Sequence, residues 1–198
     1  MRTKSGYALI LAAVIAAGAA ALVLLRSGHA EANARPDAPK STFSVAQAKG
    51  FTDFPVYDAG DSVEGLPLVA ELRRVGGGTN YVSFIYGDCT AVDDYGCAPP
   101  IEIQIWPACL RNPSLYAGPG APVGDKATVR GVPAAFYEDG RRLEIQTGTS
   151  TVVIFGRRQA EVVTVADALR GVNVPVRAGD NLPAPAAGAL DGSLRCGR

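Results

Sequence analysis

The stretch Ile101-Glu102-Ile103-Gln104-Ile105 decides the fold class, because apolar and polar residues alternate strictly along it. Side chains of a β-strand point to opposite faces in turn, so the isoleucines share one face and Glu102 and Gln104 share the other. This pattern is typical of a half-buried strand, with one face on a core and the other polar. We therefore expect a sheet that is covered on one side.

Further strand signals lie on both sides of this stretch. Leu68–Leu72 and Tyr81–Tyr86 are joined by a segment that contains three consecutive glycines, which permit the positive φ angles of a tight reversal, so we predict a hairpin. Later in the chain, turn dipeptides at Asp139-Gly140 and Gly148-Thr149 separate three more apolar runs. These runs predict an antiparallel meander of strands at Ala134–Glu138, Leu143–Thr147 and Thr151–Phe155.

One amphipathic helix is expected after these strands. Within Gln159–Arg170, apolar residues recur at the spacing of a single helix face, at Val162, Val165, Ala166 and Leu169. Gly171 provides a stop signal before Pro175. A sheet with one apolar face and a helix with one apolar face bury each other, so the predicted class is α+β, a mostly antiparallel sheet with one C-terminal packing helix.

The composition divides the chain into four segments. Residues 1–26 form an apolar N-terminal segment, and residues 27–50 read as a flexible linker interrupted by Pro36 and Pro39. Residues 51–174 are long enough for one α+β domain. Residues 175–198 form a Pro/Ala/Gly-rich tail that we expect to be flexible unless Cys196 fastens it.

The N-terminal segment carries an uncharged run of 19 residues, Tyr7–Leu25, close to the ~20 that a helix needs to cross a bilayer. Two interpretations remain open. The length of the run and Arg26 directly after it favour a retained single-pass anchor. The small-residue motifs Ala30-Glu31-Ala32 and Ala32-Asn33-Ala34 instead suit a cleaved signal peptide and a secreted protein. Positive charge before the run places the rest of the chain outside the cytoplasm in either case.

The cysteines Cys89, Cys97, Cys109 and Cys196 all follow the apolar run. Disulfides form in oxidising compartments outside the cytoplasm, so we predict two of them. Cys89 lies after one predicted strand and Cys97 before the next, which favours Cys89–Cys97 and therefore Cys109–Cys196. Zinc is disfavoured, because no Cys-x-x-Cys pair is present, and no metal ligand is assigned.

Acidic residues gather between the first two cysteines. Asp88, Asp93 and Asp94, together with Tyr95 and Trp106, form a candidate ligand or ion loop. The loop lacks the alternating acidic pattern and final glutamate of an EF-hand, so a solvated polar loop is the favoured interpretation. A second hypothesis is an aromatic ligand groove, although strand packing accounts for most of its members, which are Tyr81, Tyr86, Tyr95, Trp106 and Tyr116.

Catalytic motifs are weak. The only histidine is His29, so the serine of Gly60-Asp61-Ser62 has no imidazole partner in the domain, and this tripeptide is interpreted as a turn. A pair of carboxylates could still cleave glycosides. The candidates Glu102, Glu138 and Glu144 are each interpreted as the water-facing member of an alternating strand. No catalytic residue and no cofactor is assigned.

The charge of the chain is balanced, with 19 basic and 19 acidic residues. Lysines and arginines occur singly or in pairs and form no basic stripe, which argues against nucleic-acid binding.

Several segments carry a resemblance to a family. Phe54-Pro55-Val56-Tyr57, Gly60–Leu68, Tyr86-Gly87-Asp88-Cys89 and Cys97–Gln104 resemble uncharacterised membrane-anchored extracytoplasmic proteins of high-GC Gram-positive bacteria. The strands within Arg130–Phe155 and the helix after them are similar to units of other exported domains of unknown function. The resemblance implies a location and a fold, and it implies no activity.

Together these features predict a non-enzymatic extracytoplasmic binding or structural module that is tethered to the cell membrane. Its partner would be a protein or a glycan of the cell envelope. The alternatives are a carboxylate-dependent envelope hydrolase and a secreted binding protein.

Overall fold

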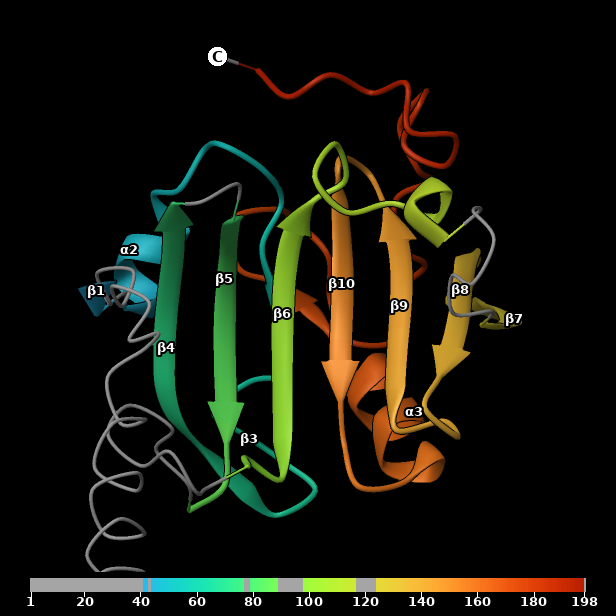
Figure 1. Cartoon of the computed structure of the whole chain (residues 1–198). Helices are drawn as coiled ribbons and strands as arrows, with labels where there is room; N and C mark the ends of the chain where they lie inside the picture. Colours follow the sequence, from blue (N-terminus) through green and yellow to red (C-terminus); the bar gives the residue numbers. More distant parts are fainter. Residues whose placement is uncertain (1–40, 43, 77–78, 89–97, 117–123, 198) are drawn as a thin grey trace, which may run out of the picture. The chain divides into compact units, whose positions relative to one another are not determined.

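The computed structural model describes residues 41–42, 44–76, 79–88, 98–116 and 124–197. Within these residues the protein has an α+β fold, a mostly antiparallel sheet with one helix near the C-terminus (Figure 1). The fold class predicted from the alternating strands is therefore confirmed. The predicted anchor Tyr7–Leu25 lies outside the described residues. Among the helices that are described, none has the length and apolar character needed to span a bilayer.

The large sheet joins two meanders. The first contains β4 (Leu66–Gly76), β5 (Thr79–Tyr86) and β6 (Ile101–Pro107), and the second contains β7 (Asp125–Val129), β8 (Val132–Tyr137), β9 (Arg142–Thr147) and β10 (Ser150–Phe155). The meanders meet where β6 pairs antiparallel with β10. The resulting order is β1-β4-β5-β6-β10-β9-β8-β7, where β1 is Ser41–Thr42, and β3 (Ser62–Val63) also pairs with β4.

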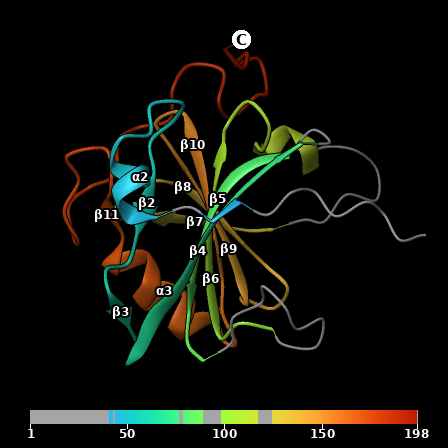
Figure 2. The same cartoon turned by 90° about the vertical axis from the view of Figure 1, so that its left-hand side faces the viewer.

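The remaining elements cover one face of this sheet. They are α2 (Val45–Lys49), α3 (Gln159–Ala168) and a small sheet of β2 (Tyr57–Asp58) and β11 (Arg170–Gly171). Figure 2 shows the large sheet nearly edge on, with these elements on the same side of it. The other side carries the connection after β6, which includes the 3₁₀ helix η1 (Pro113–Tyr116). We call the first side the core face and the second the polar face.

The core face contains the isoleucines that the sequence singled out. Ile101, Ile103 and Ile105 are fully buried, whereas Glu102, Gln104 and Trp106 alternate with them on the polar face. Helix α3 covers the core face with the apolar side chains predicted to pack there, namely Val162, Val165 and Ala166, followed by Leu169. Each fully buried aliphatic side chain stabilises the fold by about 1.5–3 kcal/mol relative to its exposed state.

Helix α3 ends earlier than predicted. It stops at Ala168, and Leu169 is already extended with φ −54° and ψ 131°. Arg170 and Gly171 then form strand β11, which pairs with Tyr57 and Asp58 of β2. Gly171 is therefore not the residue that stops the helix, because the chain leaves the helix to join the small sheet.

The turns of the second meander are confirmed at both predicted dipeptides. Asp139 and Gly140 lie in the connection between β8 and β9, and Gly148 and Thr149 join β9 to β10. Glu138 was predicted to end a strand, but it lies in the turn with φ 55°, as does Asp139. Two consecutive residues with positive φ suit the right-handed twist of a hairpin.

Several short elements have no clear sequence signal. Helix α2 lies inside the segment predicted as a flexible linker. Its first turn is closed by a capping box between Ser44 and Gln47, and Ala48 is fully buried. Five helical residues are too few to show a helical period. Strand β7 was also missed, because its sequence Asp125–Val129 lacks an alternating apolar pattern.

The C-terminal tail is fastened to the domain. Cys109 and Cys196 form a disulfide, as predicted, with Cα atoms 5.3 Å apart. Leu182 and Ala189 are buried, and the backbone amide of Ala186 donates to the carbonyl oxygen of Gly148 at 2.7 Å. The sequence predicted a flexible tail unless Cys196 fastened it, and Cys196 does so. Cys89 and Cys97 lie outside the described residues.

Candidate functional site

A cavity of about 440 Å³ opens on the polar face, over strands β7, β8 and β9. Its floor is made by small or compact residues of β8, Pro133 and Ala135. Its walls are the longer side chains of Glu144 and Gln146 on one side and of Lys126 on the other. Cross-strand neighbours share a face, so a short residue between two long ones leaves a hollow.

The sheet register explains this arrangement. Ala135 of β8 pairs with Glu144 of β9 on one side and with Lys126 of β7 on the other. The three side chains therefore stand in one row across the strands. The methyl group of Ala135 leaves the middle of the row open. Two segments outside the sheet complete the cavity, with Pro113 from η1 and Leu190 from the tail.

The disulfide links these two outer segments. Cys109 lies shortly before η1, and Cys196 follows Leu190 in the tail. The amide of Asn112 is buried and accepts from the backbone N–H of Ser114 at 3.1 Å, which fixes the start of η1. The tail reaches the same place, because a side chain at Gly192 would collide with Ser114. The cavity wall is thus cross-linked covalently.

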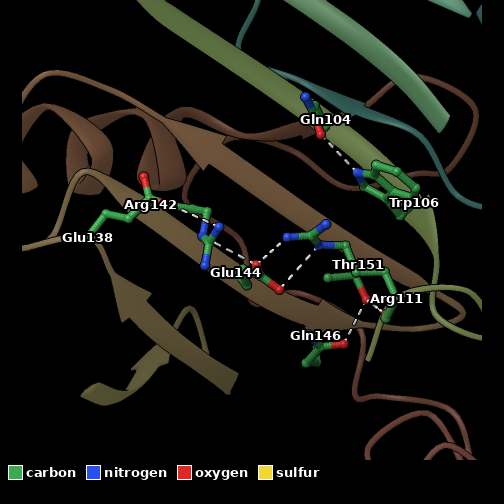
Figure 3. A network of polar contacts seen from close by, with 8 residues as sticks. All are labelled: Gln104, Trp106, Arg111, Glu138, Arg142, Glu144, Gln146 and Thr151. Carbon is green, nitrogen blue, oxygen red and sulfur yellow. Dashed lines mark hydrogen bonds and ion pairs between the residues drawn. The ribbon is translucent and has the colours of Figure 1, made fainter. Parts of the chain in front are cut away.

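A buried carboxylate lines the cavity. Glu144 is 2% exposed, and Arg111 donates to both of its oxygens, from Nε to Oε2 at 3.3 Å and from Nη2 to Oε1 (Figure 3). Arg142 Nε lies 3.5 Å from Oε1 on the other side. Arg142 also forms an ion pair of 2.9 Å with Glu138. A buried carboxylate requires such partners, because its desolvation is otherwise uncompensated.

Arg111 is itself held in place by the sheet. The hydroxyl of Thr151 on β10 donates to the backbone carbonyl of Arg111, and the side-chain amide of Gln146 lies 2.8 Å from the same hydroxyl (Figure 3). These contacts bring the connection after β6 down onto β9 and β10. The guanidinium of Arg111 therefore reaches Glu144 from above the sheet and not from a strand.

A row of stacked planar groups continues from Arg111 toward the other meander. Its guanidinium lies 5.3 Å from the ring centre of Trp106, and the rings of Trp106 and Tyr81 stack with centroids 4.3 Å apart. On the cavity side, the guanidinium of Arg142 lies 4.6 Å from the ring centre of Tyr137. Burial raises the pKa of Tyr137, and the charge of Glu144 raises it further.

A second polar cluster lies on β5 and β6. Glu102 accepts from the hydroxyl of Ser83 at 2.6 Å and from the amide of Gln104 at 3.0 Å. The amide oxygen of Gln104 in turn accepts from the indole N–H of Trp106 at 3.0 Å. The polar residues of the Ile101–Ile105 strand thus bind one another, as neighbours on the same face.

The structure changes the interpretation of the acidic candidates. Glu144 was predicted to face water, and this is wrong, because the connection after β6 covers it and two arginines pair with it. Glu138 is exposed, but it belongs to a turn. Glu102 is partly exposed on the polar face. Glu138 and Glu144 share Arg142 as a partner, whereas Glu102 contacts Ser83 and Gln104, and no described contact joins two of these carboxylates directly.

The candidate ion loop and the aromatic groove are not assembled from the described residues. Asp88 follows the C-terminal end of β5. Trp106 lies near the other end of that strand, where its ring stacks on the ring of Tyr81. Asp93, Asp94 and Tyr95 lie outside the described residues. Tyr86 is buried on the core face, away from Tyr81, and the side chain of Tyr116 is not described.

Sequence reasoning named Glu144 as a candidate carboxylate but missed the other polar residues of the cavity. The strand Arg142–Thr147 places Arg142, Glu144 and Gln146 on one face, and this polar alternation was a usable signal. The role of Arg111 had no such signal, because it depends on how a connection folds back. Lys126 was missed together with strand β7.

No group of acidic, histidine or cysteine side chains suited to a metal ion is found within the described ranges. Comparison of the chain with protein-family models, with curated proteins and with solved structures finds no match.

Proposed function

We propose that the protein is a binding module of the cell envelope. In this proposal an N-terminal helix at Tyr7–Leu25 tethers the chain to the membrane, the α+β domain lies outside the cytoplasm, and the cavity beside Glu144 takes a small ligand. The observation that carries the proposal is the cavity itself, which combines a hollow floor, apolar residues from η1 and the tail, and two convergent polar side chains, Glu144 and Gln146. Small-molecule sites commonly have this composition and a volume of about 300–1,000 Å³.

The disulfide supports the location. A disulfide between Cys109 and Cys196 is compatible with an extracellular or secreted protein, because thiols stay reduced in most cytoplasms. The single-pass anchor is the finer part of the proposal and is supported by the length of the apolar run. The resemblance to membrane-anchored proteins of high-GC Gram-positive bacteria is in keeping with both.

The contacts of the carboxylates favour binding over hydrolysis. A glycosidase needs two carboxyl groups that flank one bond, with one of them ready to donate a proton. Both oxygens of Glu144 already accept from Arg111, and Glu102 accepts from Ser83 and Gln104. Such carboxylates are organised to hold a structure and to accept hydrogen bonds from a ligand.

Thermal unfolding of the purified full chain tests the binding site. A panel of sugars, carboxylic acids, amines, amino acids and nucleotides is screened for compounds that raise the melting temperature. A ligand at ten times its Kd adds about 1.4 kcal/mol to the free energy of unfolding. The variant Ala135→Leu fills the floor of the cavity and should lose the response. Ala160→Leu, at an exposed position of α3, is the matched control and should keep it.

The proposed binding function fails if no compound stabilises the wild-type chain. It also fails if every compound that stabilises the wild type stabilises Ala135→Leu equally, because the ligand then binds elsewhere.

Carbonate extraction of cells that express the full chain tests the anchor. An integral membrane protein stays in the pellet, and external protease should digest its domain. Release of the protein into the medium with a new N-terminus near Ala32 or Ala34 would instead identify it as a secreted binding protein. Retention in the cytosol with reduced cysteines would reject both locations.

A further inference from the structure

We infer that the ligand of the cavity is a small organic monoanion that carries a carboxylate and, a few atoms away, a neutral N–H or O–H donor. This inference rests on the proposed binding function and names the chemistry of its ligand. The chemistry follows from three features of the walls. One wall offers hydrogen-bond acceptors, the opposite rim offers a cation, and the remainder is mostly apolar, with the phenol of Tyr137 as its polar member.

Gln146 contributes the first acceptor. The hydroxyl of Thr151 lies next to two groups, the carbonyl oxygen of Arg111 and the amide of Gln146. A hydroxyl carries one proton, and a backbone carbonyl can only accept. Thr151 therefore donates to Arg111, and a half-turn of the Gln146 amide lets its NH₂ group donate to the hydroxyl. The amide oxygen of Gln146 is then left for the cavity that this residue lines.

Glu144 contributes the second acceptor. An ionised carboxylate has no proton to donate, so it can bind a ligand only through donors of the ligand. Its two arginine partners do not line the cavity. A ligand in the cavity therefore meets carboxylate and amide oxygens along the β9 wall, and it must bring N–H or O–H groups to them.

Lys126 supplies the opposite charge at the rim. It is exposed and stands in the same row as Glu144, two strands away across Ala135. Strands are about 4.8 Å apart, so the Cα atoms of Lys126 and Glu144 are separated by about 10 Å. An ammonium group on a flexible stem can close on a carboxylate of the ligand from this distance.

The charge count around the cavity favours one negative charge on the ligand. Lys126, Arg111 and Arg142 are positive, and Glu144 and Glu138 are negative, which leaves one positive charge in excess. A cationic ligand would increase this excess of positive charge, and a neutral ligand would leave it uncompensated. A donor that carries no charge fits the β9 wall better than an ammonium group, because two guanidinium groups lie behind Glu144.

The apolar body of the ligand would lie against Pro113, Pro133 and Leu190. An N-acylated amino acid, or the carboxyl end of a peptide, has all three features, since its amide N–H is adjacent to its carboxylate. A 2-hydroxy acid with an aliphatic side chain has them too. Both sources share the chemistry that we infer, and a direct comparison distinguishes them.

Equilibrium dialysis of the full chain against a matched set of compounds tests the inference. N-acetylleucine carries all three features, and N-acetylleucine amide lacks the charge. 4-Methylpentanoate lacks the neutral donor, and leucine carries a charged ammonium group where N-acetylleucine carries its amide N–H. The compound 2-hydroxy-4-methylpentanoate represents the hydroxy acids. We expect N-acetylleucine or the hydroxy acid to bind with a Kd in the millimolar range. The amide, 4-methylpentanoate and leucine should each bind about tenfold more weakly.

The variant Lys126→Gln tests the position of the carboxylate. It should reduce the preference for N-acetylleucine over its amide to near unity, whereas the exposed Lys49→Gln control should keep that preference. If Lys126 had only a structural role, its replacement would weaken the binding of N-acetylleucine and of its amide equally. The better of the two acids identifies the source, a peptide end or a hydroxy acid.

The inference is overturned if the amide binds as tightly as the acid, or if Lys126→Gln leaves the preference unchanged. It is also overturned if sugars, amines or nucleotides, but none of the acids, bind in a way that Ala135→Leu abolishes. In that case the proposed binding function stands. If no compound shows binding that depends on Ala135, the binding function itself fails.

Discussion

Arg111 binds both carboxylate oxygens of Glu144, and this pairing joins the connection after β6 to the middle of β9 (Figure 3). The two residues are 33 positions apart in the chain. Arg111 also contacts the ring of Trp106, so one side chain links the two meanders across the polar face. The wall of the cavity depends on this contact because Glu144 lines it.

Replacing Arg111 with methionine should destabilise the protein by about 3–5 kcal/mol. The methionine keeps much of the packing but leaves the buried Glu144 with one fewer cation, and an uncompensated buried charge costs about this much. Urea denaturation measures the change. The matched control is Glu138→Gln, at the other end of the network, where the carboxylate is half exposed and the expected loss is below about 1 kcal/mol. Equal losses in the two variants would contradict the special role of the Arg111–Glu144 pair.

Removing the disulfide should both destabilise the chain and loosen the cavity. Replacing Cys109 and Cys196 with serine opens a covalent loop between residues 87 positions apart, and a loss of about 2–5 kcal/mol is expected. Because the bond joins the segments that carry Pro113 and Leu190, any ligand found in the screen should bind the double variant more weakly. Unchanged ligand affinity would show that the tail does not shape the site.

Tyr86 should fix the segment before β3 to the sheet. Its buried hydroxyl accepts from the backbone N–H of Ala59 at 2.9 Å and donates to the carbonyl of Gly60 at 3.1 Å. Tyr86→Phe leaves both groups without this partner and should cost about 1–3 kcal/mol in urea denaturation. Tyr81→Phe is the control, because the ring stacking on Trp106 is retained. A loss at residue 81 as large as that at residue 86 would count against this assignment.

Glu71 should reduce stability at neutral pH. Burial raises the pKa of Glu71 above its ordinary value of 4.5, the charge of Asp58 raises it further, and the backbone N–H of Val45 opposes the shift. An acid with a raised pKa favours the folded state below its unfolded value of 4.5, and that contribution is lost as the pH rises through the folded value. Glu71→Gln should therefore be more stable than the wild type at pH 7.

The stability gap between Glu71→Gln and the wild type should close as the pH falls below about 4.5. Urea denaturation of both proteins at several pH values measures it. A gap that stays constant with pH would show that the charge of Glu71 is not its cause.

The sequence predicted those parts of the fold that depend on local pattern. The alternation at Ile101–Ile105 identified the central strand and both of its faces, and the spacing of Val162, Val165 and Ala166 identified the packing face of α3. The turns at Asp139-Gly140 and Gly148-Thr149 followed from residues that tolerate positive φ. The Cys109–Cys196 bond followed from pairing the remaining cysteines.

The site could not be predicted in the same way, because it is assembled from contacts between distant segments. Glu144 looked like a solvent-facing strand residue, and nothing local indicates that Arg111 folds back to cover it. The cavity depends on Ala135 standing between Glu144 and Lys126, which requires the register of three strands. One of these, β7, has no strand signal in its sequence.

The most direct test of the binding site is the NMR spectrum of the full chain with isotope-labelled alanine methyl groups. It is recorded while the panel compound that stabilises the wild type most is added. If the ligand binds in the cavity, the methyl signal of Ala135, which lines it, shifts along a saturable curve while that of Ala160 stays in place. Saturable shifts confined to other parts of the molecule, with the Ala135 signal unmoved, would contradict a site in this cavity.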